Sequence, residues 1–384
     1  MPVKNRIANF QNDMVKWRHY FHENPELAYN EFNTSKKVVN LLKQFGISNI
    51  EEGLGKTGVV AVLENGKGKS IGLRADMDAL PINEENIDKK YKSKTVGKMH
   101  ACGHDGHTTM LLGAAKYLAE TKNFRGKIVL IFQPAEEGFA GAKAMIEDGL
   151  LDKYPIDEIY GMHNMPGLEK GVLAVEAGPR LAAADNFEVE IIGKGAHGAM
   201  PSNSIDPVLC GASIVQNIQH IVSRNADPKE TLVITVASFN SGNANNVIPK
   251  TANMTGTIRY YNNQIGELAK KRFFDVINST CNAFGAKANI NYKKGYPATI
   301  NHQEQSLFAF NTAKKVIGLK ATSSQKPMMG SEDFSYFLQK VPGCFAWIGN
   351  GESASLHNPK YDFNDDVLSI GSSFLASLAE DRLS

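Results

Sequence analysis

The part of the sequence richest in metal-binding side chains is the segment 99–107. It carries three histidines, one cysteine and one aspartate within nine residues, with small glycines between them. Histidine nitrogen, cysteine sulfur and carboxylate oxygen are the atoms that hold transition-metal ions in proteins, so the segment predicts a metal site. The alternatives are a chance cluster on a solvated loop and, for Cys102, a buried position as a small apolar residue.

Two adjacent acidic residues, Glu136 and Glu137, follow a continuous apolar run at 127–132. The run predicts a strand buried on both faces of a parallel or mixed sheet. Open α/β sheets bind their ligands beyond the carboxyl ends of the strands, so we expect both acids at such an edge. Two neighbouring carboxylates can divide the work there, one ligating a cation while the other moves protons.

Three further expected strands are also followed by residues that can act as ligands. The strands and the residues after them are 71–73 with Asp76 and Asp78, 158–160 with His163, and 345–348 with His357. A metal site at the carboxyl edge of one sheet explains this repetition economically. Because metal–ligand bonds are only about 2.0–2.3 Å long, His357 must return to the edge that the earlier residues form if it shares their metal site. The domain that holds the site is therefore expected to be discontinuous.

A different pattern begins near Asp185. Strict alternation at 187–191 predicts a half-exposed strand, and Asp206 with Pro207 predicts the start of a helix. The elements expected next are strands at about 231–239 and 251–260, a helix at about 264–283 and a strand at 288–292. The order βαββαβ is typical of a split βαβ sandwich. Such a unit has a free sheet edge or face, which is either a dimer contact or a solvated surface.

Composition excludes several classes of function. Lys and Arg number 42 against 40 Asp and Glu, a balance that excludes nucleic-acid binding through bulk charge. The four cysteines are too widely spaced for a disulfide framework, which favours a reducing compartment. No stretch approaches the ~20 apolar residues of a membrane span, and the first thirty residues lack a signal-peptide core. We therefore expect a cytoplasmic protein without membrane association.

Two loops that end in Gly-Lys-Thr and Gly-Lys-Ser fall short of a phosphate-binding loop. That motif requires a glycine five positions before its Gly-Lys pair, where this chain has Ile50 and Leu63. The second loop, at 66–70, is more simply interpreted as a hairpin turn. Nucleotide binding is therefore not expected.

Ordered motifs extend these observations over nearly the whole chain. They are WRHYFHENPELAYNE, LRADMDALP, MHACGHDGHTTMLLGAA, FQPAEEG, GMHN, KGAHGAMP, NVIPKTANMTGTIR, GSEDFSYF and LHNPKYDFND. With these motifs the chain resembles the amidohydrolase branch (subfamily D) of peptidase family M20, which contains aminoacylase, carboxypeptidase G, hippurate hydrolase and plant auxin-conjugate hydrolases. The resemblance implies an α/β, mixed-sheet, metallo-exopeptidase-like catalytic domain at 1–184 and 298–384, with a βαββαβ lid or dimerisation domain inserted at 185–297.

The resemblance also implies two divalent metal ions per subunit. Manganese or zinc is expected, and cobalt or nickel also suits mixed nitrogen, oxygen and sulfur ligands. The implied ligands, with Cys102 bridging the two ions, are Cys102, His104, Glu137, His163 and His357. Other branches of the family have a metal-binding histidine where this chain has Asp76. We therefore expect Asp76 and Asp78 to lie behind the ligands and orient them.

Catalytic and substrate-binding roles are implied for four more residues. Glu136 is cast as the general base, and His197 as a lid residue that reaches the substrate carbonyl from its own or a neighbouring subunit. Asn246 and Arg259 are cast as substrate contacts, with Arg259 meeting a carboxylate through paired hydrogen bonds. The structural alternatives are a turn residue for Asn246 and a strand-surface charge for Arg259.

The activity expected from the resemblance is metal-dependent hydrolysis of the N-acyl amide bond of N-acyl amino acids, for example N-acetyl or N-benzoyl compounds. The expected partners are this small-molecule substrate and further copies of the chain, in a homodimer or higher homo-oligomer formed through the lid domain. A metallo-dipeptidase or aminopeptidase on the same scaffold is the first alternative. A catalytically silent metal-binding protein is the second. The motifs leave open the acyl group, the amino acid and the physiological metal.

Overall fold

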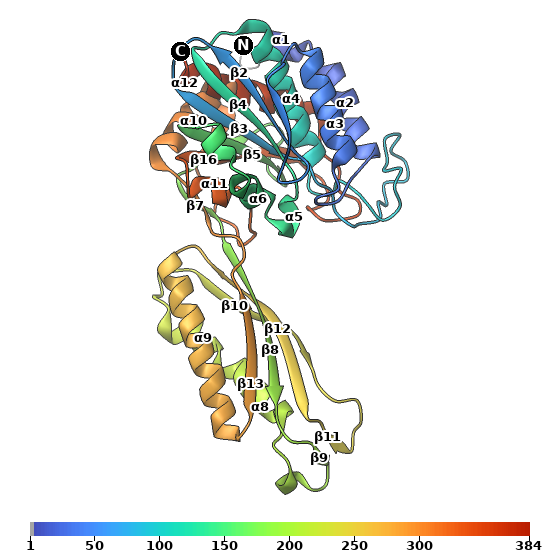
Figure 1. Cartoon of the computed structure of the whole chain (residues 1–384), viewed down its shortest axis with the longest axis vertical. Coiled ribbons are helices and arrows are strands. Elements are labelled where there is room, and N and C mark those ends of the chain that lie inside the picture. Colours follow the sequence, from blue (N-terminus) through green and yellow to red (C-terminus); the bar gives the residue numbers. More distant parts are fainter. Residues whose placement is uncertain (1–3) are drawn as a thin grey trace. The chain divides into compact units, whose positions relative to one another are not determined.

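The computed structural model describes residues 4–384, which cluster into two compact units (Figure 1). Unit 1 consists of the chain up to Arg180 together with Ile300–Lys326 and Asp333–Ser384. Unit 2 consists of Leu181–Thr299 and Pro327–Glu332. The second unit therefore interrupts the sequence of the first.

Unit 1 is built on an eight-stranded mixed sheet. In spatial order its strands are β1 (Ile50–Leu54), β2 (Gly58–Asn65), β4 (Gly126–Gln133), β3 (Ser70–Asp76), β5 (Glu158–Pro166), β16 (Gly343–Gly351), β6 (Leu173–Ala174) and β15 (Ala321–Thr322). The four central strands β4, β3, β5 and β16 run parallel to one another, whereas β2 and β6 on either side of them are antiparallel. Their carboxyl ends therefore meet at one edge of the sheet.

Helices cover this sheet so completely that every residue of β3 is buried. The helices of unit 1 are α1 (Asn5–Ala8), α2 (Gln11–Glu23), α3 (Phe32–Gln44), α4 (His104–Thr121), α5 (Glu136–Phe139), α6 (Gly141–Glu147), α7 (Leu150–Lys153), α10 (Gln303–Ile317), α11 (Ser335–Leu338) and α12 (Leu368–Arg382). Helix α4 packs on β3, β4 and β5, and α2 and α12 pack on α4, whereas α6 packs on β4 and α11 on β16. The prediction of a buried α/β sheet is confirmed.

Several boundaries differ from those expected. Strand β5 continues to Pro166 because it pairs with β16 along its length, so His163 lies inside the strand instead of after it. Helix α4 begins at His104, inside the segment 99–107 expected to bind metal, since Gly103 takes a left-handed conformation and lets the chain turn directly into the helix. The expected hairpin at 66–70 is wrong, because β2 and β3 both pair with β4 and not with each other.

Unit 2 contains a four-stranded antiparallel sheet with two helices. Its spatial order is β10 (Leu232–Asn240), β12 (Thr251–Tyr260), β8 (Ala183–Ile192) and β13 (Lys287–Lys293). The helices are α8 (Pro207–Asn217) and α9 (Asn263–Phe284), which give the chain order βαββαβ that the sequence predicts. As expected, Asp206 caps α8 by accepting from the backbone N–H groups of Val208 and Leu209. Apolar residues of both helices share one core with the sheet residues facing them.

Two short ribbons and a helical turn lie outside the two main sheets. A two-stranded ribbon pairs β9 (Ala196–His197) with β11 (Val247–Ile248), and another pairs β7 (Gly178–Leu181) with β14 (Thr299–Asn301). Helix α8 ends at Asn217, and a separate π-helical turn follows at Ile221–Asn225.

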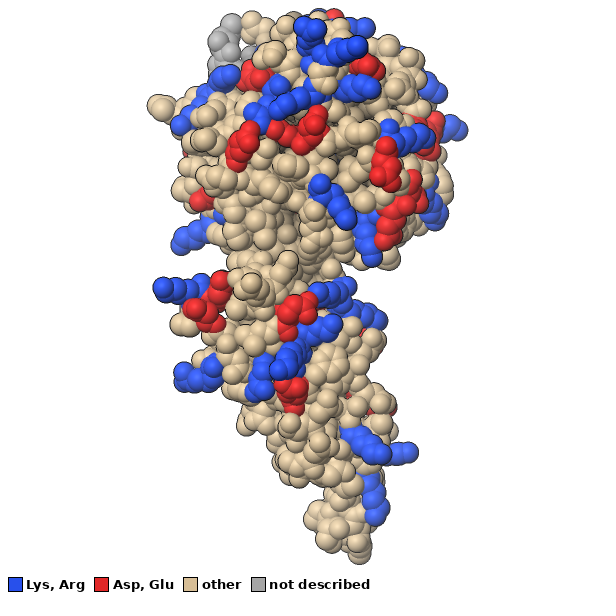
Figure 2. All heavy atoms as spheres, turned by 60° about the vertical axis from the view of Figure 1, so that its left-hand side comes forward, with Lys and Arg blue, Asp and Glu red and all other residues tan. Residues whose placement is uncertain are grey.

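Two observations concern the helices and the surface of the described residues. None of the helices within residues 4–384 is both long and apolar enough to cross a membrane. Figure 2 shows basic and acidic side chains interspersed on the visible face, without a large area of one sign.

Candidate metal centre and active site

The carboxyl edge of the unit 1 sheet brings all five predicted metal ligands together. One donor atom each from Cys102, His104 and His163 lie within 4.8 Å of one another, and the same holds for Cys102, Glu137 and His357. The Cys102 sulfur is 3.3 Å from Nε2 of His163, and Nε2 of His357 is 3.3 Å from Oε1 of Glu137. The two groups overlap at Cys102, an arrangement suited to two neighbouring cations that share one sulfur.

Unusual backbone conformations place two of these ligands. Gly103 has φ = 94°, and a Cβ atom there would lie 2.1 Å from Oδ1 of Asn164, so only glycine fits between Cys102 and the first turn of α4. His357 itself has φ = 64°, which is costly for a non-glycine residue. Its backbone N–H donates to the carbonyl oxygen of Ala101 at 2.8 Å. This bond ties the ligand to the residue that precedes Cys102.

Hydrogen bonds orient two histidine rings so that one nitrogen of each points into the site. Nδ1 of His104 donates to the carbonyl oxygen of Asp78 at 2.8 Å, and Nδ1 of His163 donates to that of Asn164 at 2.7 Å. Because a carbonyl oxygen only accepts, both Nε2 atoms are left with a free lone pair. Within residues 4–384, Nε2 of His104 is buried without a hydrogen-bond partner. A metal ion would satisfy it.

The charges around Cys102 also fit a cation. Burial, and then the carboxylates of Glu137 and Glu136, raise the pKa of the Cys102 thiol well above its usual value. The sulfur therefore becomes a thiolate only if positive charge compensates it. Burial, with the neighbouring His107 ring, lowers the pKa of His163 well below its usual value. His163 is thus neutral, the form that binds metals.

The pKa of His104 indicates an excess of negative charge in the site. Burial disfavours its charged ring, but the carboxylates of Asp76 and Asp78 outweigh this effect and raise its pKa to about 10. A hydrogen bond to Glu137 raises the pKa of His357 as well. Both shifts mean that the site attracts positive charge, which a divalent cation supplies in place of protons.

Asp78 lies where the sequence predicts a residue that orients the ligands. Its Oδ1 accepts the backbone N–H of Glu136 and its Oδ2 that of Glu137, both at 3.0 Å. Its carbonyl oxygen holds the His104 ring. One buried aspartate thus sets the direction of two acidic residues and one histidine.

Asp76 is engaged differently. Its Oδ1 is 2.6 Å from Nδ1 of His107, and its Oδ2 accepts from Arg74 at 2.8 Å. Both oxygens thus have partners in the protein, although one donor atom of Asp76 also lies within 4.8 Å of those of His104 and His107. Nε2 of His107 is in turn 2.7 Å from Oδ1 of Asn164, which connects Asp76 to the end of β5.

Sequence reasoning missed the buried polar residues that support this edge. Arg74 donates to Gln133 at 2.7 Å and to Asp333 at 2.9 Å, and so joins the ends of β3 and β4 to the segment after Glu332. Glu31 accepts the backbone N–H of Ala135 at 2.9 Å, directly before Glu136. Asp333 and Glu31 belong to the motifs GSEDFSYF and HENPELAYNE, so acidic residues in otherwise unassigned motifs were the available signal.

The remaining predicted residues lie in unit 2, at two different places. His197 is exposed in the β9–β11 ribbon, where it pairs with Val247, and the carbonyl oxygen of Asn246 accepts from the N–H of Gly198. The ribbon thus brings His197 and Asn246 together. Arg259 lies instead in β12, opposite Ala184 of β8.

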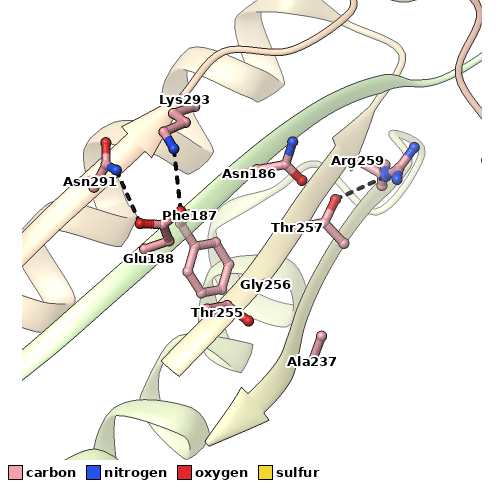
Figure 3. Close-up of a pocket in the computed structure, with 10 residues that line it drawn as sticks. All are labelled: Asn186, Phe187, Glu188, Ala237, Thr255, Gly256, Thr257, Arg259, Asn291 and Lys293. Atoms are coloured by element: carbon pink, nitrogen blue, oxygen red, sulfur yellow. Dashed lines mark hydrogen bonds and ion pairs between the residues drawn. The ribbon is translucent and has the colours of Figure 1, made fainter. Parts of the chain in front are cut away.

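Arg259 borders a hollow of about 350 Å³ on the polar face of the unit 2 sheet (Figure 3). Its Nε donates to the Thr257 hydroxyl at 2.9 Å, and one terminal nitrogen is 3.4 Å from the carbonyl oxygen of Met329. Within the described residues it forms no ion pair with a carboxylate. Burial alone lowers its pKa. A half-buried guanidinium without an acidic partner is able to receive a carboxylate.

Together these features place the chain among two-domain α/β proteins that gather metal donors at a sheet edge. Comparison with known families is consistent with this class: residues 72–381 match the model described as peptidase family M20/M25/M40. The chain belongs to this family.

Individual relatives agree with the assignment. The chain is 43% identical to a hippurate hydrolase of Campylobacter jejuni over 97% of each chain. It is 40% identical to the IAA-amino acid hydrolase ILR1-like 4 of Arabidopsis thaliana, over 99% of this chain and 88% of the relative. Among solved structures, the YXEP protein of Bacillus subtilis, described as a dinuclear metal-binding peptidase of the M20 family, matches with a TM-score of 0.86 and 32% identity, over 98% of this chain and 99% of that one.

Proposed function

We propose that this protein is a metal-dependent amidohydrolase that cleaves the N-acyl bond of N-acyl amino acids, releasing a carboxylic acid and a free amino acid. The observation that carries the proposal is the pair of donor groups that share Cys102 at the sheet edge, next to Glu136. The relatives named for hippurate and for indole-3-acetic acid conjugates support the substrate class. Both names describe an acyl group joined to an amino acid.

The proposed cofactor is a pair of divalent metal ions, manganese or zinc. Cys102, His104 and His163 would hold one ion, and Cys102, Glu137 and His357 the other. When bound, such ions polarise an amide carbonyl and make a water molecule more acidic. A thiolate ligand requires reducing conditions, so the proposal includes a cytoplasmic location.

Glu136 is proposed as the general base. Its carboxylate lies with Glu137 and His104 in a third group of donor atoms within 4.8 Å of one another. From this place it can take a proton from the attacking water and return it to the nitrogen of the leaving amine. The nearly complete burial of Glu136 keeps bulk water away from that transfer.

Unit 2 is proposed as the lid and dimerisation domain. In this role Arg259 binds the substrate carboxylate, Asn246 contacts the substrate, and His197 stabilises the negative charge that develops on the amide oxygen. These assignments follow the family resemblance. The guanidinium of Arg259, which forms no ion pair with a carboxylate of the described residues, and the exposure of His197 support them.

Strand geometry favours two subunits at each active site. Thr251 and Arg259 are at opposite ends of β12, opposite Ile192 and Ala184 respectively, and His197 lies in the ribbon beyond the Thr251 end. At 3.4 Å per residue, the eight steps from Thr251 to Arg259 span roughly 27 Å. That is longer than an N-acyl amino acid. If His197 and Arg259 both touch one substrate molecule, they come from different copies of the chain, which supports a homodimer.

The activity is tested by free-amine release from a panel of compounds. The panel contains N-acetyl, N-benzoyl and N-indoleacetyl amino acids, together with dipeptides, and the reduced enzyme is reconstituted with manganese or zinc. Release from the acyl compounds that stops on chelation supports the proposal. Cleavage of dipeptides alone would instead identify a peptidase, and silence on every compound with metal bound would contradict amide hydrolysis.

The two-subunit site is tested by mixing two inactive variants. Chains carrying Glu136→Ala and chains carrying His197→Ala are coexpressed with different tags, and mixed dimers are purified through both tags. If His197 acts across the dimer, each mixed dimer contains one complete site, and we expect up to half of the wild-type activity. Mixed dimers without activity would assign His197 to its own subunit.

A further inference from the structure

The turn that carries Glu136 and Glu137 adopts a conformation that does not form easily on its own. Ala135, directly before Glu136, is left-handed with φ = 55° and ψ = 42°. For a residue with a Cβ atom this conformation costs about 1–2 kcal/mol relative to the right-handed region. The surrounding structure must therefore hold it in place.

Two buried carboxylates hold this turn through three consecutive backbone N–H groups. Glu136 and Glu137 donate to Asp78, as described above, and Ala135 donates to Oε1 of Glu31 at 2.9 Å. Hydrogen bonds to an ionised acceptor are about twice as strong as neutral ones. Without Glu31, the N–H of Ala135 would lose this bond to a carboxylate, and the left-handed residue would lose its anchor.

Glu31 is itself fixed. Its side chain is fully buried, and Oε2 accepts the hydroxyl of Thr57 at 2.6 Å, from the turn between β1 and β2. Burial, opposed by these hydrogen bonds, raises the pKa of Glu31 to about 7. A carboxylate in such a place is unfavourable for stability unless hydrogen bonds compensate it, and Glu31 accepts such bonds from Ala135 and Thr57.

We propose that Glu31 is a positioning residue for the general base: by holding Ala135 in the left-handed conformation, it directs the Glu136 carboxylate toward the reacting atoms. The proposal rests on the proposed function for its kinetic readout only. Misplacing a catalytic group by about 1 Å costs on the order of 10²-fold in rate. We therefore expect loss of Glu31 to lower kcat and leave KM nearly unchanged.

Glu26 provides a matched control in the same motif. Its carboxylate accepts the backbone N–H and the hydroxyl of Thr34 at 2.8 and 3.0 Å, and the Asn33 amide at 2.7 Å. Like Glu31, it ties side chain to backbone near the start of α3. The Glu26 carboxylate makes none of the contacts with the 135–137 turn. Its replacement therefore measures the effect of losing a carboxylate near the start of α3 without a change at that turn.

The experiment compares Glu31→Ala, Glu31→Gln and Glu26→Gln with the wild type. Glu31→Ala is expected to lower kcat about 100-fold, with KM within about 3-fold and metal content unchanged. Glu31→Gln is expected to recover most of that loss, since its amide oxygen still accepts from Ala135 and its amide nitrogen can donate to the Thr57 oxygen. Glu26→Gln is expected to keep kcat within about 2-fold of the wild type.

Crystal structures of the same variants give a readout independent of turnover. We expect φ of Ala135 to become negative in Glu31→Ala and to stay positive in Glu31→Gln and Glu26→Gln. A wild-type kcat in Glu31→Ala, or a left-handed Ala135 that persists in it, would overturn the proposal. If Glu31→Ala does not fold, Thr57→Val takes its place, because it removes only the hydrogen bond to Oε2 of Glu31. This variant is expected to lower kcat about 3- to 10-fold. An unchanged kcat in Thr57→Val would overturn the proposal. A wild-type enzyme inactive on all amides would defeat the proposed function, while φ of Ala135 would still decide the role of Glu31.

Discussion

Charged residues gather on a sheet in both units of this protein, but they do so in opposite environments. At the carboxyl edge of the unit 1 sheet, Arg74, Asp76 and Asp78 are each no more than 1% exposed and bonded to defined partners. On the open face of the unit 2 sheet, Glu188 and Lys293 form an ion pair with 59% and 62% of their side chains exposed. Burying charges is costly, so the first arrangement indicates chemistry, whereas the second is typical of a solvated surface.

Topology explains why the two sheets differ. Parallel strands require helical crossovers on both faces, which bury the sheet and leave an edge where several chain turns meet. The antiparallel sheet of unit 2 is covered by α8 and α9 on one face only. Two residues of unit 2 depart from this pattern: Asp185 is buried and accepts from Tyr260 and Tyr292, and Arg259 is half buried and forms no ion pair with a carboxylate of the described residues. The following predictions test this contrast, from the largest expected effect to the smallest.

Removing the shared sulfur should have the largest effect. Cys102→Ala is expected to reduce the bound metal from two ions per chain to fewer than one and to abolish turnover, because both donor groups lose a ligand. Metal content measured by mass spectrometry checks this. Cys344→Ala, which changes another buried cysteine of unit 1, should keep both ions. Two ions retained in Cys102→Ala would show that the sulfur is not shared.

Removing the base should separate chemistry from metal binding. Glu136→Ala is expected to lower kcat by about 10³-fold or more while both ions remain bound, since Glu136 belongs to neither Cys102 group. Turnover and metal content are measured on the same preparation. An active variant would remove Glu136 from the role of general base.

Arg259 tests whether unit 2 contributes to substrate binding. Arg259→Lys is expected to raise KM about 10- to 100-fold for N-acyl amino acids, because an ammonium cannot replace the paired hydrogen bonds of a guanidinium. The matching N-acyl amino acid amides, which lack the carboxylate, should show little change. Equal effects on acids and amides would assign Arg259 a structural role.

The buried ion pair behind the site should affect stability more than activity. His22 is fully buried, 2.8 Å from Asp105 and 3.2 Å from Glu84. Burial disfavours its charge, but the hydrogen bonds to these two acids outweigh that effect and raise its pKa to about 9. The protonated ring therefore contributes stability that is complete below about pH 6.5 and is lost as the pH rises through about 9.

His22→Gln is accordingly expected to lower the free energy of unfolding by about 2 kcal/mol at pH 6 to 7. The difference from the wild type should shrink above pH 9, where His22 is neutral in both folded and unfolded states. Urea denaturation of both proteins at pH 6, 8 and 10 measures it. A difference that does not change with pH would mean that His22 is not charged in the folded protein.

The exposed pair of unit 2 should matter least. Glu188→Gln removes the charge opposite Lys293, and the expected change in melting temperature is below about 1 °C, with kcat and KM unchanged. Thermal unfolding and the amide assay check both. A clear loss of activity would show that the polar face of this sheet takes part in the reaction.

The sequence predicts that the metal-binding side chains gather at one sheet edge, because several of them lie at or just beyond the ends of buried strands. The run at 127–132 and the acids at Glu136 and Glu137 show this most clearly, since an apolar run and the residues just beyond it identify a sheet edge. The βαββαβ order of unit 2 was predictable for a related reason. Strict alternation of apolar and polar residues, as at 187–191, indicates a strand in a sheet with one covered face.

The supporting residues could not be predicted from local patterns. Glu31 reaches Ala135 and Arg74 reaches Asp333 only after folding, and nothing in the neighbouring sequence distinguishes a buried acid from a solvated one. The predicted end of the strand near His163 was wrong for a similar reason. His163 was expected after its strand, but β5 continues because β16 lies beside it, a contact invisible in the sequence around 163.

The pairing of β5 with β16 has a consequence for the order in which the protein forms. Nearly all of unit 2 lies between these strands in the chain, so β5 leaves the ribosome with an unpaired edge and keeps it until Gly343 and later residues emerge. The strands of unit 2 pair among themselves meanwhile and need no residue from the C-terminal end for their sheet. Contacts between residues so distant in sequence form slowly. The carboxyl ends of the central strands, where the predicted ligands meet, are therefore brought together only after unit 2 and β16 have been synthesised.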